Sequence, residues 1–225
     1  NDHVNAEAQD AGGSNNANFA TPADGGSGRM QMYLWTAPTP DRDGDVDNGI
    51  IVHEYGHGIS NRLTGGPANV GCLSNQEQMG EGWSDYYALM LTQNWATATL
   101  NTGFNSPRGI GTYALNQAIT GVGIRPARYT TDMAVNNYPY ANLPSMAVPH
   151  GVGFVWCTII WDMTWNIINQ NGTINPNIYN FAAGGGNVIA MKIVTEALKI
   201  QQCAPGFVSG RNAILQADQI LYGGT

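Results

Sequence analysis

The chain has 225 residues, enough to bury a core as one large domain or as a smaller one with two lobes. Its 16 acidic and 9 basic side chains give a net charge of −7, which leaves no basic face for nucleic-acid phosphates or for an anionic membrane surface. The 43% of hydrophobic residues, with six Trp and ten Tyr, exclude a disordered acidic tail, and the most apolar window, residues 152–161, is far shorter than the ~20 residues that cross a bilayer.

The N-terminal part is expected to hold little regular structure. It opens without an initiator Met or an apolar leader, so we expect a mature or excised piece from which any signal or pro-segment has been removed. The first 28 residues are polar and rich in Gly and Asn, and at most one short strand is expected there. Residues 30–35 alternate, with Met30, Met32 and Leu34 on one face, which predicts a half-buried strand. An acidic turn over residues 41–49 then ends with a candidate helix N-cap.

Helical sequence dominates the rest of the chain, so the predicted fold class is mainly α with a small β portion. Apolar residues at three- and four-residue steps predict helices over 50–61, 76–92, 148–168, 187–201 and 208–222, with a weaker one over 109–119. The helix over 148–168 is apolar nearly all round, which predicts a central helix buried on several sides. The connection over 120–147 has three prolines and little periodicity, and so long a loop is typically functional or stabilised by an ion.

Three cysteines allow at most one internal disulfide. Cys72 and Cys203 lie in loop sequence, whereas Cys157 lies in an apolar helical run and is interpreted as a small buried hydrophobe. A Cys72–Cys203 bridge is therefore expected, and it would fit an extracellular compartment. The alternative is that both are free thiols.

The strongest motif is His53-Glu54-Tyr55-Gly56-His57. Residues four apart share a helix face, so the two imidazoles can converge on one zinc ion while Glu54 reaches a water bound to that ion. The alternative is a surface helix that happens to carry two histidines.

Zinc sites built on this motif fall into classes that differ in their third protein ligand. A motif extended by a third histidine is excluded, because Ser60 and Leu63 stand where it needs Gly and His. The next predicted helix instead carries Glu81 and Asp85, the first of them 24 residues beyond His57. Their spacing puts both carboxylates on one face, so that Glu81 binds zinc and Asp85 orients a ligand imidazole. The alternative is an acidic helix face turned to solvent.

His150 is one of only four histidines and stands at the start of the long apolar helix. Placed beside zinc, it would donate a hydrogen bond to the oxyanion of a tetrahedral intermediate. Judged from spacing alone, a buried structural donor is the stronger interpretation.

The segments HEYGHGISNRLTGGPANVGCL and MGEGWSDYYA resemble the catalytic core of the fungalysin family of secreted zinc metallopeptidases, thermolysin-like gluzincins. Similar segments lie at residues 15–22, 29–33, 129–133 and 210–215, so the resemblance covers nearly the whole chain. It implies a zincin fold in which this chain is the C-terminal portion of the catalytic domain. Residues 1–47 would then be a strand and loop part of the upper lobe, and residues 48–225 the zinc helices and helical lobe.

The resemblance also implies roles for individual residues. His53, His57 and Glu81 would bind one catalytic Zn²⁺, and Asp85 would hold a ligand histidine. Glu54 would deprotonate the zinc-bound water and then protonate the leaving amine.

For the substrate, the resemblance implies three further contacts. His150 would be the oxyanion donor, and Asn16 and Ala17 would bind the substrate main chain. Cys72 stands where thermolysin-type enzymes place a second oxyanion donor, a tyrosine, so that role has no candidate here.

The resulting hypothesis is a secreted zinc endopeptidase acting on proteins, with a hydrophobic residue preferred after the scissile bond. The family's catalytic domains are longer, so a pro-segment or a missing N-terminal lobe is an expected partner. One alternative is a non-catalytic binding or scaffold fragment that retains a structural zinc. Another is a gluzincin aminopeptidase, although the chain has no GxMEN-like segment to form a pocket for a free α-amine.

Two further motifs stand apart from the zinc motif. Asp41, Asp43, Asp45 and Asp47 suggest either an irregular Ca²⁺ site or an acidic turn that caps the zinc helix. An EF-hand is excluded, since Val46 and Val52 occupy its Gly and bidentate Glu positions. The sequence Asn171-Gly172-Thr173 is a glycosylation acceptor if the source is eukaryotic.

Overall fold

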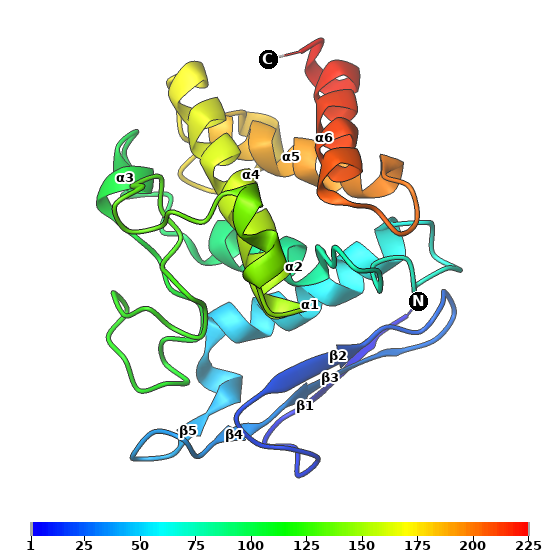
Figure 1. Cartoon of the computed structure of the whole chain (residues 1–225), viewed down its shortest axis with the longest axis vertical. Helices are drawn as coiled ribbons and strands as arrows, with labels where there is room; N and C mark the ends of the chain where they lie inside the picture. Colours follow the sequence, from blue (N-terminus) through cyan, green and yellow to red (C-terminus); the bar gives the residue numbers. More distant parts are fainter. Residues whose placement is uncertain (1, 225) are drawn as a thin grey trace.

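Three short strands near the N-terminus form a small sheet beneath the helices (Figure 1). The computed structural model describes residues 2–224. The strands are β1 Val4–Glu7, β2 Ala17–Ala20 and β3 Gly28–Met32, in the order β1-β3-β2. β1 runs parallel to β3 and β2 antiparallel to it. The expectation of at most one strand in the first 28 residues was therefore wrong. Of the eight residues in β1 and β2 only Ala17 is buried, so these strands lack a strong apolar pattern and are defined by pairing with β3.

The alternating segment over residues 30–35 is interrupted at Tyr33. Met30 and Met32 of β3 are buried as predicted, but Leu34 is only half-buried while Trp35 is buried. β3 ends before Tyr33, and Leu34–Trp35 forms β4, which pairs with β5, Arg42–Asp43, in a separate two-stranded sheet.

The remaining elements are helical, which confirms the mainly α class. They are η1 Gly44–Val46, α1 Asn48–Leu63, α2 Gly80–Thr92, α3 Thr102–Asn105, η2 Tyr140–Ser145, α4 His150–Asn171, η3 Phe181–Ala183, α5 Gly186–Ile200 and α6 Phe207–Tyr222. The five helices predicted with strong periodicity are present, and their ends lie within a few residues of the predicted ones.

The weaker helix predicted over 109–119 is absent. Gly111 and Asn116 have φ angles of 71° and 55°, in the left-handed region, so the chain turns there and no helix can propagate. Ile110 forms a parallel bridge with Gly123, which ties this segment to the long loop that follows.

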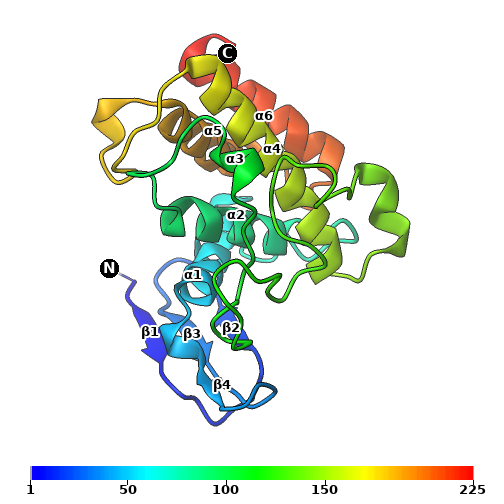
Figure 2. The same ribbon diagram turned by 90° about the vertical axis from the view of Figure 1, so that its left-hand side faces the viewer.

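α4 is the central helix and packs between α2 and α5 (Figures 1 and 2). Its large side chains, among them Trp156, Trp161 and Trp165, are almost fully buried. Among the described residues, α4 is the one helix long and apolar enough to cross a membrane, but 72% of its apolar window is buried inside the protein. That burial is the pattern of a core helix.

Two glycines allow the helices around the site to approach closely. A Cβ on Gly56 of α1 would lie 2.8 Å from the Cα of Ser84 in α2. A Cβ on Gly153 of α4 would lie 2.4 Å from the Cβ of Glu81. These contacts hold α2 against both neighbouring helices, which fixes where Glu81 points.

The Cys72–Cys203 disulfide joins the α1–α2 connection to the α5–α6 connection. Cys157 is a free and buried thiol within α4.

Candidate metal centre

The acidic turn before α1 caps the helix that carries the histidines. Asp47 accepts hydrogen bonds from the backbone N–H groups of Gly49 and Ile50, at 3.0 and 3.3 Å. Its other oxygen accepts from the Ala114 N–H at 3.0 Å. Asp47 therefore satisfies unpaired donors of the first turn and anchors the loop that contains Ala114, after α3, to the start of α1.

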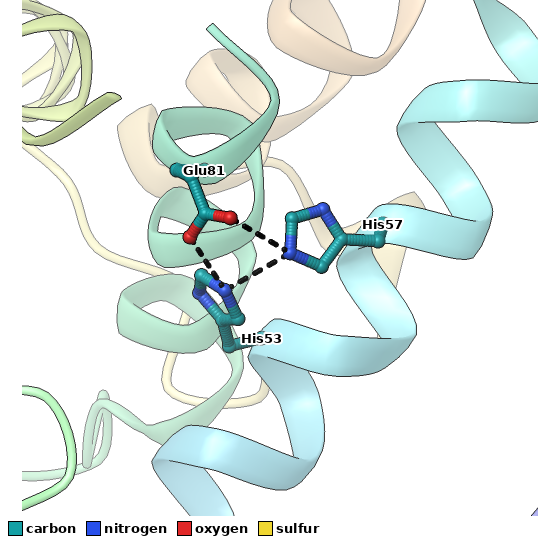
Figure 3. Close-up of side chains that lie close together, drawn as sticks. All are labelled: His53, His57 and Glu81. Carbon is teal, nitrogen blue, oxygen red and sulfur yellow. Dashed lines mark hydrogen bonds and ion pairs between the residues drawn. The ribbon is translucent and has the colours of Figure 1, made fainter. Parts of the chain in front are cut away.

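Three side chains from α1 and α2 converge at one point (Figure 3). The Nε2 atoms of His53 and His57 lie 3.1 Å apart. Glu81 Oε2 lies 3.1 Å from His53 Nε2, and Glu81 Oε1 lies 3.5 Å from His57 Nε2. Two imidazole nitrogens and a carboxylate, all within 4.8 Å of one another, are the donor set that a catalytic zinc takes from protein.

The electrostatics of this cluster favour a cation. Burial disfavours a charged His53, but hydrogen bonds to Asp85 and Glu81 outweigh it and raise the pKa of His53 to about 10. Burial and the charge of His53 lower the pKa of His57 to about 4, so its imidazole is neutral. Burial opposes ionisation of Glu81 too, yet the two histidines and Arg125 lower its pKa to about 2. A metal ion would replace the proton that these carboxylates hold on His53.

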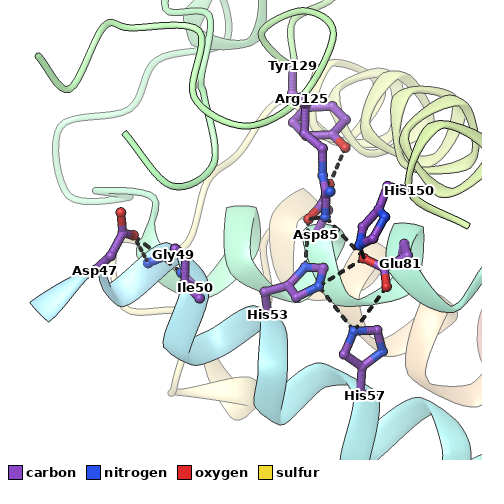
Figure 4. Close-up of polar contacts among 10 residues, drawn as sticks. All are labelled: Asp47, Gly49, Ile50, His53, His57, Glu81, Asp85, Arg125, Tyr129 and His150. Carbon is purple, nitrogen blue, oxygen red and sulfur yellow. Dashed lines mark hydrogen bonds and ion pairs between the residues drawn. The ribbon is translucent and has the colours of Figure 1, made fainter. Parts of the chain in front are cut away.

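Asp85 lies behind His53 and has no exposed surface (Figure 4). His53 Nδ1 lies 2.7 Å from Asp85 Oδ1, so Nε2 is turned toward Glu81 and His57. Arg125 donates to both Asp85 oxygens, from Nε at 2.7 Å and from Nη2 at 2.9 Å. The hydroxyl of Tyr129 donates to Asp85 Oδ2. Burial raises the pKa of Asp85, but Arg125 and His53 outweigh burial and hold that pKa well below its usual value.

Arg125 and Tyr129 were missed as site residues by the sequence analysis. Both lie in the loop over 120–147, which has no periodicity to reveal which side chains turn inward. Arg125 is buried and Tyr129 has no exposed surface, and Arg125 Nη2 also lies 3.2 Å from Glu81 Oε2. The one signal in the sequence was the length of the loop, together with the family-like segment that begins at Tyr129.

Glu54 follows His53 on α1 and is buried, with 5% exposure. Its Oε2 atom has no hydrogen-bond partner among the described residues. Burial raises the pKa of Glu54 to about 7. A buried carboxylate with a free oxygen beside a metal position is a candidate proton acceptor.

One cleft of about 880 Å³ is lined by the three candidate ligands together with Glu54 and Arg125. Asp85 and Tyr129 do not line it. Asn16 and Ala17, at the start of β2, lie along one wall, and β2 is an edge strand of its sheet. The large apolar residues of the wall are Phe19, Trp35, Ile50, Ile110, Leu115 and Ile124.

His150 also lines this cleft, as the first residue of α4. Its side chain is 59% exposed, and its Nε2 lies 3.7 Å from Glu81 Oε2 (Figure 4). His150 is therefore not the buried structural donor that its spacing alone favoured.

Asp43 and Asp45 of the acidic turn accept hydrogen bonds from protein groups. Gln9 donates to Asp43 through its side chain and to Asp45 through its backbone. Within residues 2–224, His53, His57 and Glu81 are the only cluster of three or more His, Cys, Asp or Glu side chains close enough to share a metal. A Ca²⁺ site at Asp41, Asp43, Asp45 and Asp47 therefore has no structural support.

Comparison with known proteins places this geometry in context. A sequence profile of the fungalysin metallopeptidase family (M36) matches residues 1–225. The chain is 46% identical to extracellular metalloproteinase 2 of Trichophyton tonsurans, and 45% identical to extracellular metalloproteinase MEP of Fusarium vanettenii. Each match covers 100% of this chain and 35% of the relative, so the chain spans about a third of the length of these curated relatives.

Proposed function

This chain belongs to the fungalysin family of metallopeptidases, and on that premise we propose that it is the zinc-binding part of a secreted endopeptidase that hydrolyses peptide bonds in proteins. The observation that supports this most directly is the convergence of His53, His57 and Glu81 beside the buried, unpartnered Glu54 in one open cleft. The name "extracellular" that the relatives carry supports secretion.

His53, His57 and Glu81 would hold the zinc ion. When bound, zinc supplies a Lewis acid that polarises a substrate carbonyl and makes water more acidic. Asp85 fixes the ring of His53, and Arg125 and Tyr129 in turn fix Asp85.

Glu54 and His150 would carry out the proton transfer and the charge stabilisation. Glu54 takes a proton from the attacking water as its oxygen bonds to the peptide carbonyl carbon. His150 donates a hydrogen bond to the oxyanion that develops on the carbonyl. Glu54 then gives the proton to the peptide nitrogen, and the C–N bond breaks.

The substrate would lie along β2. An edge strand offers free backbone groups, so an extended peptide can pair with it, with Asn16 and Ala17 contacting the substrate main chain. The apolar residues of the cleft wall, such as Ile50 and Ile124, would accept a hydrophobic side chain after the scissile bond.

The rest of the enzyme would complete this site. The relatives are about three times as long. We propose that residues 1–47 belong to an upper lobe, residues 48–225 form the helical lobe, and an N-terminal lobe of the longer protein extends the upper one. The same length difference favours one alternative, a non-catalytic fragment that retains a structural zinc.

Replacement of Glu54 tests the proposal. Glu54→Gln should keep stoichiometric zinc and lower peptidase activity by about 10²- to 10⁴-fold, because the amide cannot accept the proton. The measurements are metal analysis and cleavage of casein or a fluorogenic peptide, with Glu196→Gln, remote on α5, as the matched control. Full activity of Glu54→Gln would exclude the mechanism. If the 225-residue chain binds zinc and cleaves nothing while the longer protein is active, this chain alone is the scaffold of the alternative.

A further inference from the structure

The proposed peptidase chemistry leaves one motif unused, at the end of α4. Asn171, Gly172 and Thr173 form the only Asn-X-Ser/Thr sequence, with X other than Pro, in the chain. We propose that Asn171 carries an N-linked oligosaccharide. This proposal rests on the secretion included in the proposed function, through a eukaryotic secretory pathway such as that of the fungal relatives.

The folded structure leaves room for a glycan at Asn171. Asn171 is the last residue of α4, and Gly172 follows with a φ of 73° and turns the chain back. This turn brings Thr173 beside Asn171, so the threonine Oγ1 donates a hydrogen bond of 2.5 Å to Asn171 Oδ1. All three residues are exposed, and within residues 2–224 the Nδ2 of Asn171 makes no hydrogen bond.

The position would keep a glycan away from the cleft. Asn171 and His150 are the two ends of α4, a helix of 22 residues. A helix of that length spans about 33 Å. Figure 1 shows α4 running from its N-terminus above α1 to a C-terminal end at the far edge of the helical part. A mobile glycan on Asn171 would therefore leave the substrate path open.

The surface near the motif gives a glycan a physical role. Only 11% of the residues are charged, so the chain has few groups that hydrate strongly. The segment that follows the motif exposes two aromatic side chains, Tyr179 at 69% and Phe181 at 40%. A bulky, hydrophilic oligosaccharide at Asn171 would increase the solubility of this end of the molecule.

The modification requires a lipid diphosphate oligosaccharide as donor. A bond forms between Asn171 Nδ2 and C1 of the terminal sugar, and the bond from C1 to the diphosphate oxygen breaks. The lipid diphosphate leaves with the electron pair, and the proton lost from Nδ2 goes to the transferase. Nothing is oxidised or reduced.

The test is production of the protein in a yeast secretory host, with both secreted and cell-retained material analysed, since the glycan is added before folding is complete. Endoglycosidase digestion should remove one glycan per chain, and peptide mass spectrometry after peptide N-glycosidase should locate the resulting Asp at position 171. Asn171→Gln and Thr173→Ala should both abolish the mobility shift. Thr173→Ser should retain it at least in part, because serine also completes the Asn-X-Ser/Thr motif.

Asn169→Gln is the matched control, because Asn169 is exposed on the same last turn of α4 and lies outside the motif. It should be glycosylated like the wild type. An unmodified Asn171 in the wild-type protein, or a shift that persists in Asn171→Gln, would overturn the proposal. Peptidase activity is assayed separately, so loss of the glycan with full activity, or activity loss with the glycan intact, identifies which of the two proposals fails.

Discussion

At the scale of single residues, Asp85 organises the candidate site. Its two oxygens accept hydrogen bonds from three side chains, which come from α1 and from two positions of the long loop. The spacing of Glu81 and Asp85 on one helix was sufficient to expect a carboxylate behind a histidine. The donors on its other side could not be predicted, because nothing in the sequence around Arg125 and Tyr129 indicates that they face a helix 40 or more residues away.

Tyr129 should matter for metal affinity more than for stability. Tyr129→Phe keeps the ring that packs on Phe154 at 5.2 Å and removes only the hydroxyl donor to Asp85. Removing a direct hydrogen-bond partner of a metal ligand typically weakens metal binding by about 10- to 100-fold. Tyr129 acts one step further out, through Asp85, so its loss should fall at the lower end, about 10-fold. We expect a loss of this size in zinc competition with a chromophoric chelator.

Tyr87→Phe is the control for this measurement, since the buried Tyr87 hydroxyl bonds instead to Thr195 at 3.0 Å. It should retain wild-type zinc affinity. Equal zinc affinities for the two variants would show that Tyr129 only packs in the core.

His150 should affect turnover without affecting metal content. Its side chain lines the cleft and lies near Glu81, outside the set of converging ligand atoms. Loss of one oxyanion donor lowers kcat by about 10²- to 10³-fold. We therefore expect His150→Ala to lower kcat to this extent, with KM and bound zinc close to those of the exposed control His3→Ala. Unchanged kcat, or a loss of zinc, would contradict the assigned role.

At the scale of elements, the helices that could be predicted are those with a periodic pattern of apolar residues. α1, α2, α4, α5 and α6 repeat apolar residues at helical steps, and all were predicted. The segment over 109–119 has a similar apolar content, but Gly111 and Asn116 adopt left-handed conformations that end any helix. β1 and β2 lack alternation because the sheet buries little of them, so only pairing with β3 defines them.

α4 carries one group that should make stability depend on pH. Asp162 is half-buried, and its Oδ1 has no hydrogen-bond partner among the described residues. Burial raises the pKa of Asp162 from 3.8 to about 6. Between these values the folded protein holds a proton that the unfolded chain has released, so stability falls as the pH rises from about 4 to about 6. Above about pH 6 the buried carboxylate is charged, and the protein keeps the full loss of stability that this charge causes.

Asp162→Asn should remove this cost. Because the carboxylate is partly exposed, we discount the shift to about 1 kcal/mol of unfolding free energy. In a protein of this size that corresponds to a Tm roughly 2–4 °C above the wild type at pH 7. The difference should vanish near pH 4.

The measurement is thermal unfolding in chelator at both pH values, so that zinc release does not contribute. Asp24→Asn, at a side chain 70% exposed, is the control and should show no such difference. A stabilisation by Asp162→Asn that is the same at both pH values would disprove the assignment to ionisation.

At the scale of the whole molecule, the proposed zinc ligands depend on a connection that is anchored far along the chain. The candidate ligands lie on α1 and α2, and the connection between these helices contacts the α5–α6 region through several hydrogen bonds. They include Gln201 to Thr64 at 2.7 Å, Asn75 to Pro205 at 2.9 Å, the Ala204 N–H to the Cys72 carbonyl at 2.9 Å and the Phe207 N–H to Glu77 at 2.7 Å. The disulfide adds a covalent link across a sequence separation of 131 residues.

This link should stabilise the fold without forming part of the site. Closing so long a loop restricts the unfolded chain, and removing a native disulfide typically costs about 2–5 kcal/mol. At about 2–4 °C per kcal/mol for a protein of this size, the double variant Cys72→Ser/Cys203→Ser should unfold roughly 5–15 °C below the wild type.

Reductant should lower the Tm of the wild type and of Cys157→Ala, whose bridge is intact, and leave the Tm of the double variant unchanged. Zinc affinity, measured well below these transitions, should be similar in all three proteins, because the bridge touches none of the ligands. A double variant that unfolds at the same temperature as the wild type would show that the hydrogen bonds between the two connections suffice. A double variant that stays folded but loses zinc would show that the bridge positions the ligands.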